Sequence, residues 1–152
     1  MYEQYGNQVA FYAVYILEAH PTDIWTMQSN VKDNVLFASP KNDQERENVA
    51  NACVRKLGIK FPAIVDGFDN TTEKAYTGWP DRLYLISSDG KVLYKSKPGP
   101  FGFKPDQLEG AIKKLPEVRA GFTNVVSVSS EQGANIGFFG LQGTAYQSIM
   151  GW

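Results

Sequence analysis

Residues Val9 to Trp25 read Val-Ala-Phe-Tyr-Ala-Val-Tyr-Ile-Leu-Glu-Ala-His-Pro-Thr-Asp-Ile-Trp, and this stretch decides the fold. The run as far as Leu17 is apolar or aromatic without a break, which predicts a strand buried on both faces under helices. Glu18 and His20 follow directly. Ligands of open α/β sheets bind at the carboxyl ends of strands, so the chain's only histidine lies where chemistry is expected.

Length and composition narrow the class of protein. A chain of 152 residues fits one domain with a sizeable core, and 43% hydrophobic with 20% charged residues is ordinary globular composition. The net charge of -1 offers no basic surface for nucleic acid. One cysteine excludes an internal disulfide. The sequence has no apolar run long enough for a membrane span and no signal-peptide pattern, which leaves the compartment open with the cytoplasm as default.

The remaining elements follow from apolar periodicity and from helix caps. Asn42 and Gly58 are the expected cap and stop of a helix over Asp43–Leu57. Pro21–Asn34 is expected to be a polar loop. The other expected elements are a helix end in Met1–Gln8, strands at Phe61–Val65, Arg82–Ile86 and Lys91–Lys95, helical turns in Asn70–Tyr76 and a helix over Pro105–Leu115.

This order of elements predicts an α/β fold of the thioredoxin-like class, with a mixed sheet flanked by helices. A proline often precedes the third core strand of that fold, and Trp79-Pro80 stands just before Arg82–Ile86. We expect a domain over residues 1–116 that is truncated at its amino end. Residues 117–152, which are rich in glycine, serine and glutamine, form a C-terminal extension of unknown role.

Glu18 and His20 are the candidate catalytic residues. Residues two apart on an extended segment point to the same side, where a carboxylate can orient an imidazole and raise its pKa. Such a pair is suited to acid–base work, although a solvated loop histidine fits the spacing equally well. Glu18, His20 and Asp23 together are a weak metal pattern, so we expect no metal and no cofactor.

Arg82 is the candidate substrate-binding residue, because it begins a strand expected to reach the same sheet edge. A guanidinium there needs a carboxylate, either on Glu18 or Asp81 or on an anionic ligand. Cys53 falls on the apolar face of its helix and is expected to pack in the core. Trp25 and Trp79 are expected to be packing residues.

Several of these stretches, in the same order, resemble the iodothyronine deiodinases, most closely their bacterial, redoxin-like relatives. The resemblance covers about Tyr5 to Leu115. The stretches that carry it are Tyr15–Trp25, Val65–Asn70, Ala75-Tyr76, Arg82–Tyr84 and Gly99–Phe103. It implies a thioredoxin-like fold and reductive dehalogenation, in which a selenocysteine or cysteine attacks the halogen. Glu18 and His20 match the family's proton-transfer residues, and Arg82 matches the arginine that holds the substrate carboxylate.

The chain departs from the family pattern at two places. The family nucleophile precedes the residues that match Met1–Gln8, so we expect this chain to lack it. The histidine that assists the arginine in the animal enzymes falls near Pro40, which leaves that clamp incomplete and does not favour thyronine as substrate. We therefore expect a deiodinase-like protein that takes a small aromatic or carboxylate-bearing substrate but has no redox nucleophile of its own. The alternative is a non-catalytic module that binds a small acid or a protein partner, and oligomerisation stays open.

The expected truncation removes a central strand, and buried backbone groups on both sides of the gap need new partners. The gap can close by direct pairing, by a partner chain or by another part of this chain. Asn124–Val128 is the one unassigned strand-like run, so we expect it to insert in the sheet or to lie along an exposed edge. Insertion would bring Ser129 and Ser130 near the family's nucleophile position. A disordered tail on a marginal or oligomeric sheet is the alternative.

Overall fold

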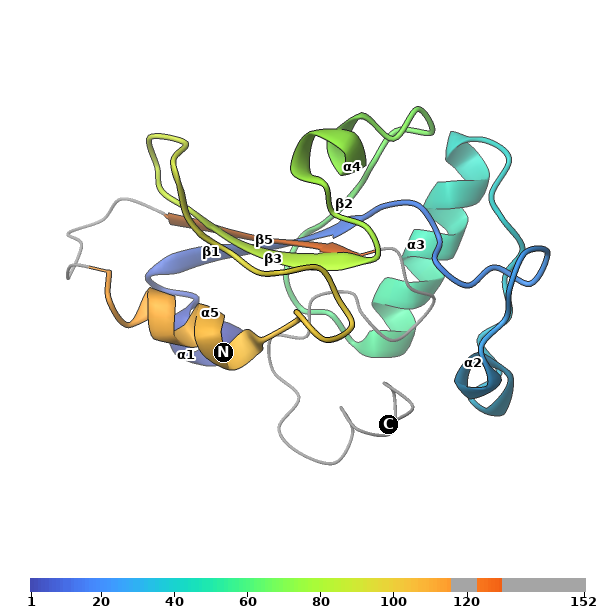
Figure 1. Cartoon of the computed structure of the whole chain (residues 1–152), viewed down its shortest axis with the longest axis horizontal. Helices are drawn as coiled ribbons and strands as arrows, with labels where there is room; N and C mark the ends of the chain where they lie inside the picture. The colour runs from blue at the N-terminus through green and yellow to red at the C-terminus, as the bar shows by residue number, and fades with distance from the viewer. Residues whose placement is uncertain (116–122, 130–152) are drawn as a thin grey trace.

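The computed structural model describes residues 1–115 and 123–129, the latter through their backbone, and contains a five-stranded mixed sheet between helices (Figure 1). The strands are β1 (Val9–Tyr15), β2 (Ala63–Val65), β3 (Asp81–Ile86), β4 (Val92–Lys95) and β5 (Thr123–Ser129). The helices are α1 (Tyr2–Tyr5), α2 (Gln28–Lys32), α3 (Asp43–Leu57), α4 (Thr71–Tyr76) and α5 (Pro105–Ile112). The predicted α/β class is confirmed. No helix in the described part of the chain has the length and apolar character needed to cross a membrane.

The alternation of side chains along β1 separates two apolar layers. Val9, Phe11 and Tyr15 join the main core cluster together with residues of α1, α3 and α5. Val14 and Ile16 pack on the opposite side, against Tyr76 of α4. Figure 1 accordingly shows α1 and α5 below the sheet and α4 above it. Both faces of β1 are therefore covered by apolar side chains, and this is why its sequence is apolar almost without interruption.

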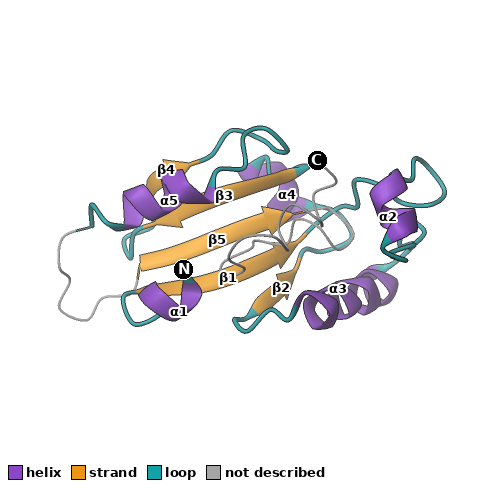
Figure 2. Ribbon diagram, turned by 90° about the horizontal axis from the view of Figure 1, so that it is seen from below, coloured by secondary structure: helices purple, strands orange, loops and turns teal. Residues whose placement is uncertain are grey.

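The strand β5 lies in the middle of the sheet, in the order β2-β1-β5-β3-β4 (Figure 2). It runs parallel to β1, from Val9↔Thr123 to Tyr15↔Ser129, and antiparallel to β3, from Asp81↔Ser129 to Ile86↔Asn124. Of the two positions expected for Asn124–Val128, insertion in the sheet is the one that the structure shows, and the position along an exposed edge is excluded. The inserted strand supplies ladder partners to the facing backbones of β1 and β3, which would otherwise be unsatisfied.

Helix α3 begins and ends as predicted. The Asn42 side chain accepts a hydrogen bond from the Glu45 N–H at 2.9 Å, and the Glu45 carboxylate accepts one from the Lys41 N–H at 2.8 Å. Gly58 ends the helix in the left-handed conformation, with φ 61°. Because these signals are local, the sequence alone predicted both ends.

Several predicted elements differ from the structure in their ends, and β2 begins at Ala63 where a strand was predicted from Phe61. The strand predicted as far as Leu17 ends at Tyr15, and Leu17 is 42% exposed. The helix predicted to Leu115 ends at Ile112. The expected loop Pro21–Asn34 contains the short helix α2, which has no side-chain cap to mark its start. Ends of elements are set by the last backbone hydrogen bonds, and these depend on neighbouring segments as well as on residue type.

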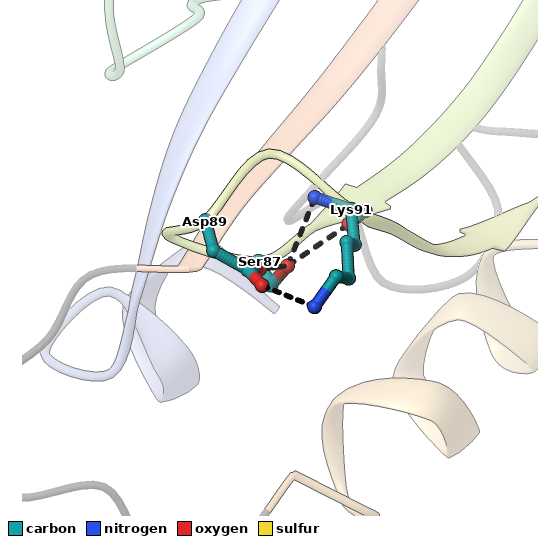
Figure 3. Close-up of polar contacts among 3 residues, drawn as sticks. All are labelled: Ser87, Asp89 and Lys91. Carbon is teal, nitrogen blue, oxygen red and sulfur yellow. Dashed lines mark hydrogen bonds and ion pairs between the residues drawn. The ribbon is translucent and has the colours of Figure 1, made fainter.

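The hairpin between β3 and β4 is closed by Ser87, Asp89 and Lys91 (Figure 3). The Lys91 N–H donates to Ser87 Oγ at 3.1 Å, and the Ser87 hydroxyl donates to the Asp89 carboxylate. Lys91 Nζ lies 2.7 Å from the other Asp89 oxygen, but both of these side chains are exposed. An exposed ion pair contributes little, so Ser87 is the residue that organises this turn.

We expect Ser87→Ala to lower the free energy of unfolding by about 1 kcal/mol, because the Lys91 N–H loses its acceptor and the Asp89 carboxylate its donor. Urea denaturation of the full chain measures the change. Ser88→Ala is the matched control, since Ser88 is exposed, and it should leave the midpoint nearly unchanged. Equal shifts in the two variants would show that the hydroxyl of Ser87 does not organise the hairpin.

Candidate functional site

The candidate site lies at the sheet edge formed by the carboxyl ends of β1 and β5 and the amino end of β3. Val14 of β1 and Arg82 of β3 pair with the same residue, Val128 of β5, from its two sides. Glu18 and His20 follow the end of β1 within five residues. The sheet therefore brings Glu18, His20 and Arg82 to one edge, toward which the arrowheads of β1 and β5 point in Figure 2.

The two candidate residues that follow β1, Glu18 and His20, differ in exposure. Glu18 is buried, with 6% of its surface exposed, and His20 is half-buried. The His20 ring meets the ring of Trp25 edge to face, with 4.5 Å between the ring centroids and 77° between the planes. An imidazole held against an aromatic ring has a restricted orientation, as a proton-transfer group requires.

The loop that carries His20 is tied to the segment before α3. The Thr22 N–H donates to the Phe37 carbonyl at 2.8 Å, and the Asp23 carboxylate accepts from the Ser39 N–H at 2.8 Å. The Ser39 hydroxyl donates to the same oxygen at 3.0 Å. These bonds hold the pKa of Asp23 below its usual value, and the bond from the Ser39 N–H has the largest effect. Asp23 thus positions the loop. Among the described residues, no group of three or more His, Cys, Asp or Glu side chains lies close enough together to hold a metal ion.

Arg82 is half-buried at the amino end of β3. Its Nη1 donates to the Ser96 carbonyl at 3.5 Å, a long hydrogen bond. Its Nε is buried and has no hydrogen-bond partner within residues 1–115. A guanidinium has five N–H donors and no acceptor, so Arg82 can still bind an acceptor such as a carboxylate.

Asp81 and Gly99 form the wall beside Arg82. Asp81 is fully buried, and its carbonyl accepts from the Gly99 N–H at 3.1 Å. A side chain at position 99 would overlap the Asp81 carboxylate, so only glycine fits there. The segment Gly99–Phe103 is consequently held against the start of β3. In the sequence this segment is marked only by its resemblance to a known family. The close approach of two distant segments leaves no pattern in the residues around either of them.

Asp66, which follows the end of β2, joins β1 to α4. The Asp66 N–H donates to the Tyr15 carbonyl, and its carboxylate oxygens accept from the Thr72 and Glu73 N–H groups, each at 2.9 Å. The side chain is 3% exposed. A buried carboxylate at the amino end of α4 caps the helix and fixes it beside β1.

Arg46 holds the loop after Asp66. Its Nη1 donates to the Gly67 carbonyl at 2.6 Å, and its guanidinium lies 5.3 Å from the centre of the Phe68 ring. Only 2% of the surface of Arg46 is exposed. A charge can be buried this far because backbone carbonyls take its donors. Asp43 holds the same loop by accepting from the Phe68 N–H at 2.7 Å.

The prediction that Trp25 and Trp79 are packing residues is wrong. Trp25 is 63% exposed and Trp79 47% exposed. The sequence contains both rings but does not say which atoms cover them, and aromatic residues are partly exposed more often than aliphatic ones. Cys53, in contrast, is buried in the main core cluster as predicted.

The chain is similar to known proteins over most of the described residues. The family model for iodothyronine deiodinase matches residues 1–116. Type I iodothyronine deiodinase of Xenopus laevis is 31% identical over 109 residues, which cover 71% of this chain and 41% of the relative. Thyroxine 5-deiodinase of Gallus gallus is 34% identical over 99 residues, 64% of this chain and 36% of the relative. The same enzyme of Ovis aries is 30% identical over 115 residues, 75% of this chain and 37% of the relative.

The chain spans about two fifths of the length of these relatives, and no solved structure matches it. The matched residues contain Glu18, His20 and Arg82 and end before β5. The resemblance inferred from Tyr15–Trp25 and the later stretches is thereby confirmed. The roles of the three site residues and the division of the chain between residues 116 and 117 stay predictions.

Proposed function

We propose a function from one premise: this chain belongs to the iodothyronine deiodinase family. The relationship is to oxidoreductases of the deiodinase type. The proposed function of the sheet edge is to bind a small aromatic acid and to provide the proton-transfer groups of a reductive dehalogenation. Arg82 binds the carboxylate, His20 delivers the proton, and Glu18 orients His20 and stabilises its charged form.

The observation that carries this proposal is the pairing of Val14 and Arg82 with the same residue of β5. This pairing supports a site in which one molecule reaches both the end of β1 and the start of β3. Trp25 comes after the end of β1 in the sequence, and Trp79 comes shortly before the start of β3. Both rings are partly exposed. An exposed aromatic ring against the imidazole, as Trp25 provides, suits an aromatic acid.

The proposed reaction needs a proton, a nucleophile and a reductant. A thiolate or selenolate attacks the halogen, and the electron pair of the carbon–halogen bond stays on the carbon. That carbon then takes a proton, for which His20 is the donor. A second thiol attacks the halogenated sulfur or selenium, which releases the halide and leaves a disulfide or selenenyl sulfide. The net result is one halogen replaced by hydrogen and two thiol-type groups oxidised.

We further propose that this chain does not supply the nucleophile. Cys53 is its only cysteine, and 2% of its surface is exposed. A buried thiol in apolar surroundings is inert, because its thiolate form is disfavoured there. The second candidate function is therefore a non-catalytic module that binds a small acid, which the half-buried guanidinium of Arg82, with its long hydrogen bond to the Ser96 carbonyl, favours.

We expect the full chain to bind 3-iodobenzoate, and Arg82→Met to weaken binding at least tenfold, because the carboxylate loses a charged donor pair. Quenching of tryptophan fluorescence, with Trp25 beside His20, measures the affinity. Arg55→Met, an exposed arginine at the end of α3, is the matched control and should bind as the wild type does. Equal affinities of the two variants would exclude Arg82 as the anchor.

Iodide release tests the proposed lack of a nucleophile in this chain. With dithiothreitol as reductant the isolated chain should release no iodide from 3-iodobenzoate, because no thiol of the chain is accessible. Iodide release that disappears in Cys53→Ser would overturn the proposed lack of a nucleophile. A cysteine codon or UGA in frame upstream of Met1 would identify the missing group and favour the enzyme over the binding module.

A further inference from the structure

A concave surface lies between β4 and α5. It is an open groove of about 630 Å³, within the roughly 300–1,000 Å³ that small-molecule sites occupy. Its sheet side is lined by Leu85, Leu93 and Tyr94, and its helix side by Gln107, Gly110 and Lys114. The helix residues are spaced by three and four, so they form one stripe along α5 and the turn after it. Ala111 and Leu115 complete the lining.

The groove is separate from the candidate site at the sheet edge. Leu85 lies three residues along β3 from Arg82, which places the two on opposite faces of the sheet. Leu85 belongs to the main core cluster, on the side of α1 and α5. A ligand in the groove would therefore not touch Arg82.

The groove has apolar walls and polar groups at particular places. Leu85 and Leu93 line the sheet wall, and Leu93 is 50% exposed. Tyr94 and Gln107 bridge the two walls through a hydrogen bond of 3.5 Å from the Tyr94 hydroxyl. Burial, with a smaller effect of Asp106, raises the pKa of Tyr94 and keeps this donor protonated.

Lys114 supplies a positive charge that no carboxylate of residues 1–115 pairs. Lys113, the residue before it, pairs with Glu109 at 2.8 Å on the side of α5 that faces Tyr5. Lys114 is exposed and makes no ion pair with any residue of the described chain. A free cation beside an apolar wall attracts an anion that carries an apolar body.

Gly110 keeps the helix wall of the groove open. It stands inside α5, where glycine is among the least favourable residues. A Cβ atom at this position would meet nothing within 4 Å, so no neighbouring atom requires glycine there. A residue that breaks the local preference without a packing reason is expected at functional surfaces.

We propose that this groove binds a small amphipathic anion, with its apolar body against Leu93 and Ala111 and its acid group at Lys114. The proposal goes beyond the deiodinase-type function and does not depend on it. The acid can belong to an aliphatic chain or to an aromatic ring, since the groove offers apolar walls and one cation to either.

Decanoate is the aliphatic probe, 3-phenylpropionate the aromatic probe and decanol the uncharged counterpart of decanoate. Amide shifts in ¹H–¹⁵N spectra of the full chain locate and titrate binding. We expect saturable shifts at Leu93, Gly110 and Ala111 with decanoate, with 3-phenylpropionate or with both, and at least tenfold weaker binding of decanol. Lys114→Gln should weaken anion binding at least fivefold, whereas Lys113→Gln should change it less than twofold.

Gly110→Phe fills the groove and should abolish binding, and Gly110→Ala, which leaves most of it open, should bind within threefold of the wild type. If Gly110→Phe fails to fold, the Lys114 and Lys113 pair still decides the matter. Equal binding of decanoate and decanol, equal effects of the two lysine variants, shifts centred on Arg82 or no saturable shifts in the millimolar range would each overturn the proposal. Because 3-iodobenzoate is also an aromatic anion, the sheet-edge site is tested independently by amide shifts near Arg82 that Arg82→Met abolishes and that Lys114→Gln leaves unchanged.

Discussion

A chain that ends at residue 116 is expected to show no cooperative unfolding transition, although it keeps every residue that matches the deiodinase family. The truncation removes β5, and β1 and β3 then lose their partner on that side. The pairing runs over the whole of β1 and the whole of β3. At about 1–3 kcal/mol for each buried backbone group left unpaired, the loss exceeds the 5–15 kcal/mol that stabilises an ordinary domain.

A single substitution tests the same point in the full chain. Val126 pairs with Tyr12 on one side and with Tyr84 on the other. Val126→Pro removes a ladder donor in a central strand, and we expect a loss of about 3 kcal/mol or more in the free energy of unfolding. Val126→Ile keeps the donor and the strand preference and is the matched control.

Urea denaturation followed by circular dichroism measures both variants. Hydrogen exchange reports on β5 directly, and the amides of Val125, Val126 and Val128 should exchange slowly in the wild type. A chain that ends at residue 130 keeps β5 and should keep its transition. Fast exchange at all three amides, or a stable monomer without β5, would show that β1 and β3 do not need this strand.

The second large effect is expected at Asp66. Asp66→Ala removes two charged hydrogen bonds from the Thr72 and Glu73 N–H groups at a position that is 3% exposed. Loss of a helix cap together with buried unsatisfied donors predicts a decrease of about 2–4 kcal/mol in the free energy of unfolding. Asp66→Asn keeps one acceptor oxygen and should lie between alanine and the wild type.

Asp69→Ala is the control in the same loop. Asp69 is exposed, and its carboxylate accepts from the Thr71 N–H at 3.2 Å. Its hydrogen bond with the Thr71 side chain, and next the bond from the Thr71 N–H, lower its pKa. Its removal should cost less than about 1 kcal/mol, because solvent can replace the lost acceptor. Exchange rates of the Thr72 and Glu73 amides should rise in Asp66→Ala and stay unchanged in Asp69→Ala. Equal destabilisation by both variants would contradict the cap.

The sequence by itself determined those features whose cause lies within a few residues. Asn42 and Gly58 mark the two ends of α3 because a cap and a left-handed stop act on the adjacent turn. The apolar runs of β1 and β3 predicted buried strands, and strand ends predicted that Glu18, His20 and Arg82 would share an edge. The need to pair buried backbone groups, a rule that holds in every fold, predicted that Asn124–Val128 would enter the sheet.

Only the tertiary structure decided the features that depend on distant segments. It set the direction of β5, parallel to β1 and antiparallel to β3, and its register against both strands. A slip of one residue would turn every side chain of the strand to the other face, so the register depends on which face the neighbouring elements cover. It buried Arg46 through the Gly67 carbonyl, exposed Trp25, and left open the groove beside Gly110. Burial of a side chain depends on which remote atoms reach it, and neither spacing nor composition along the chain carries that information.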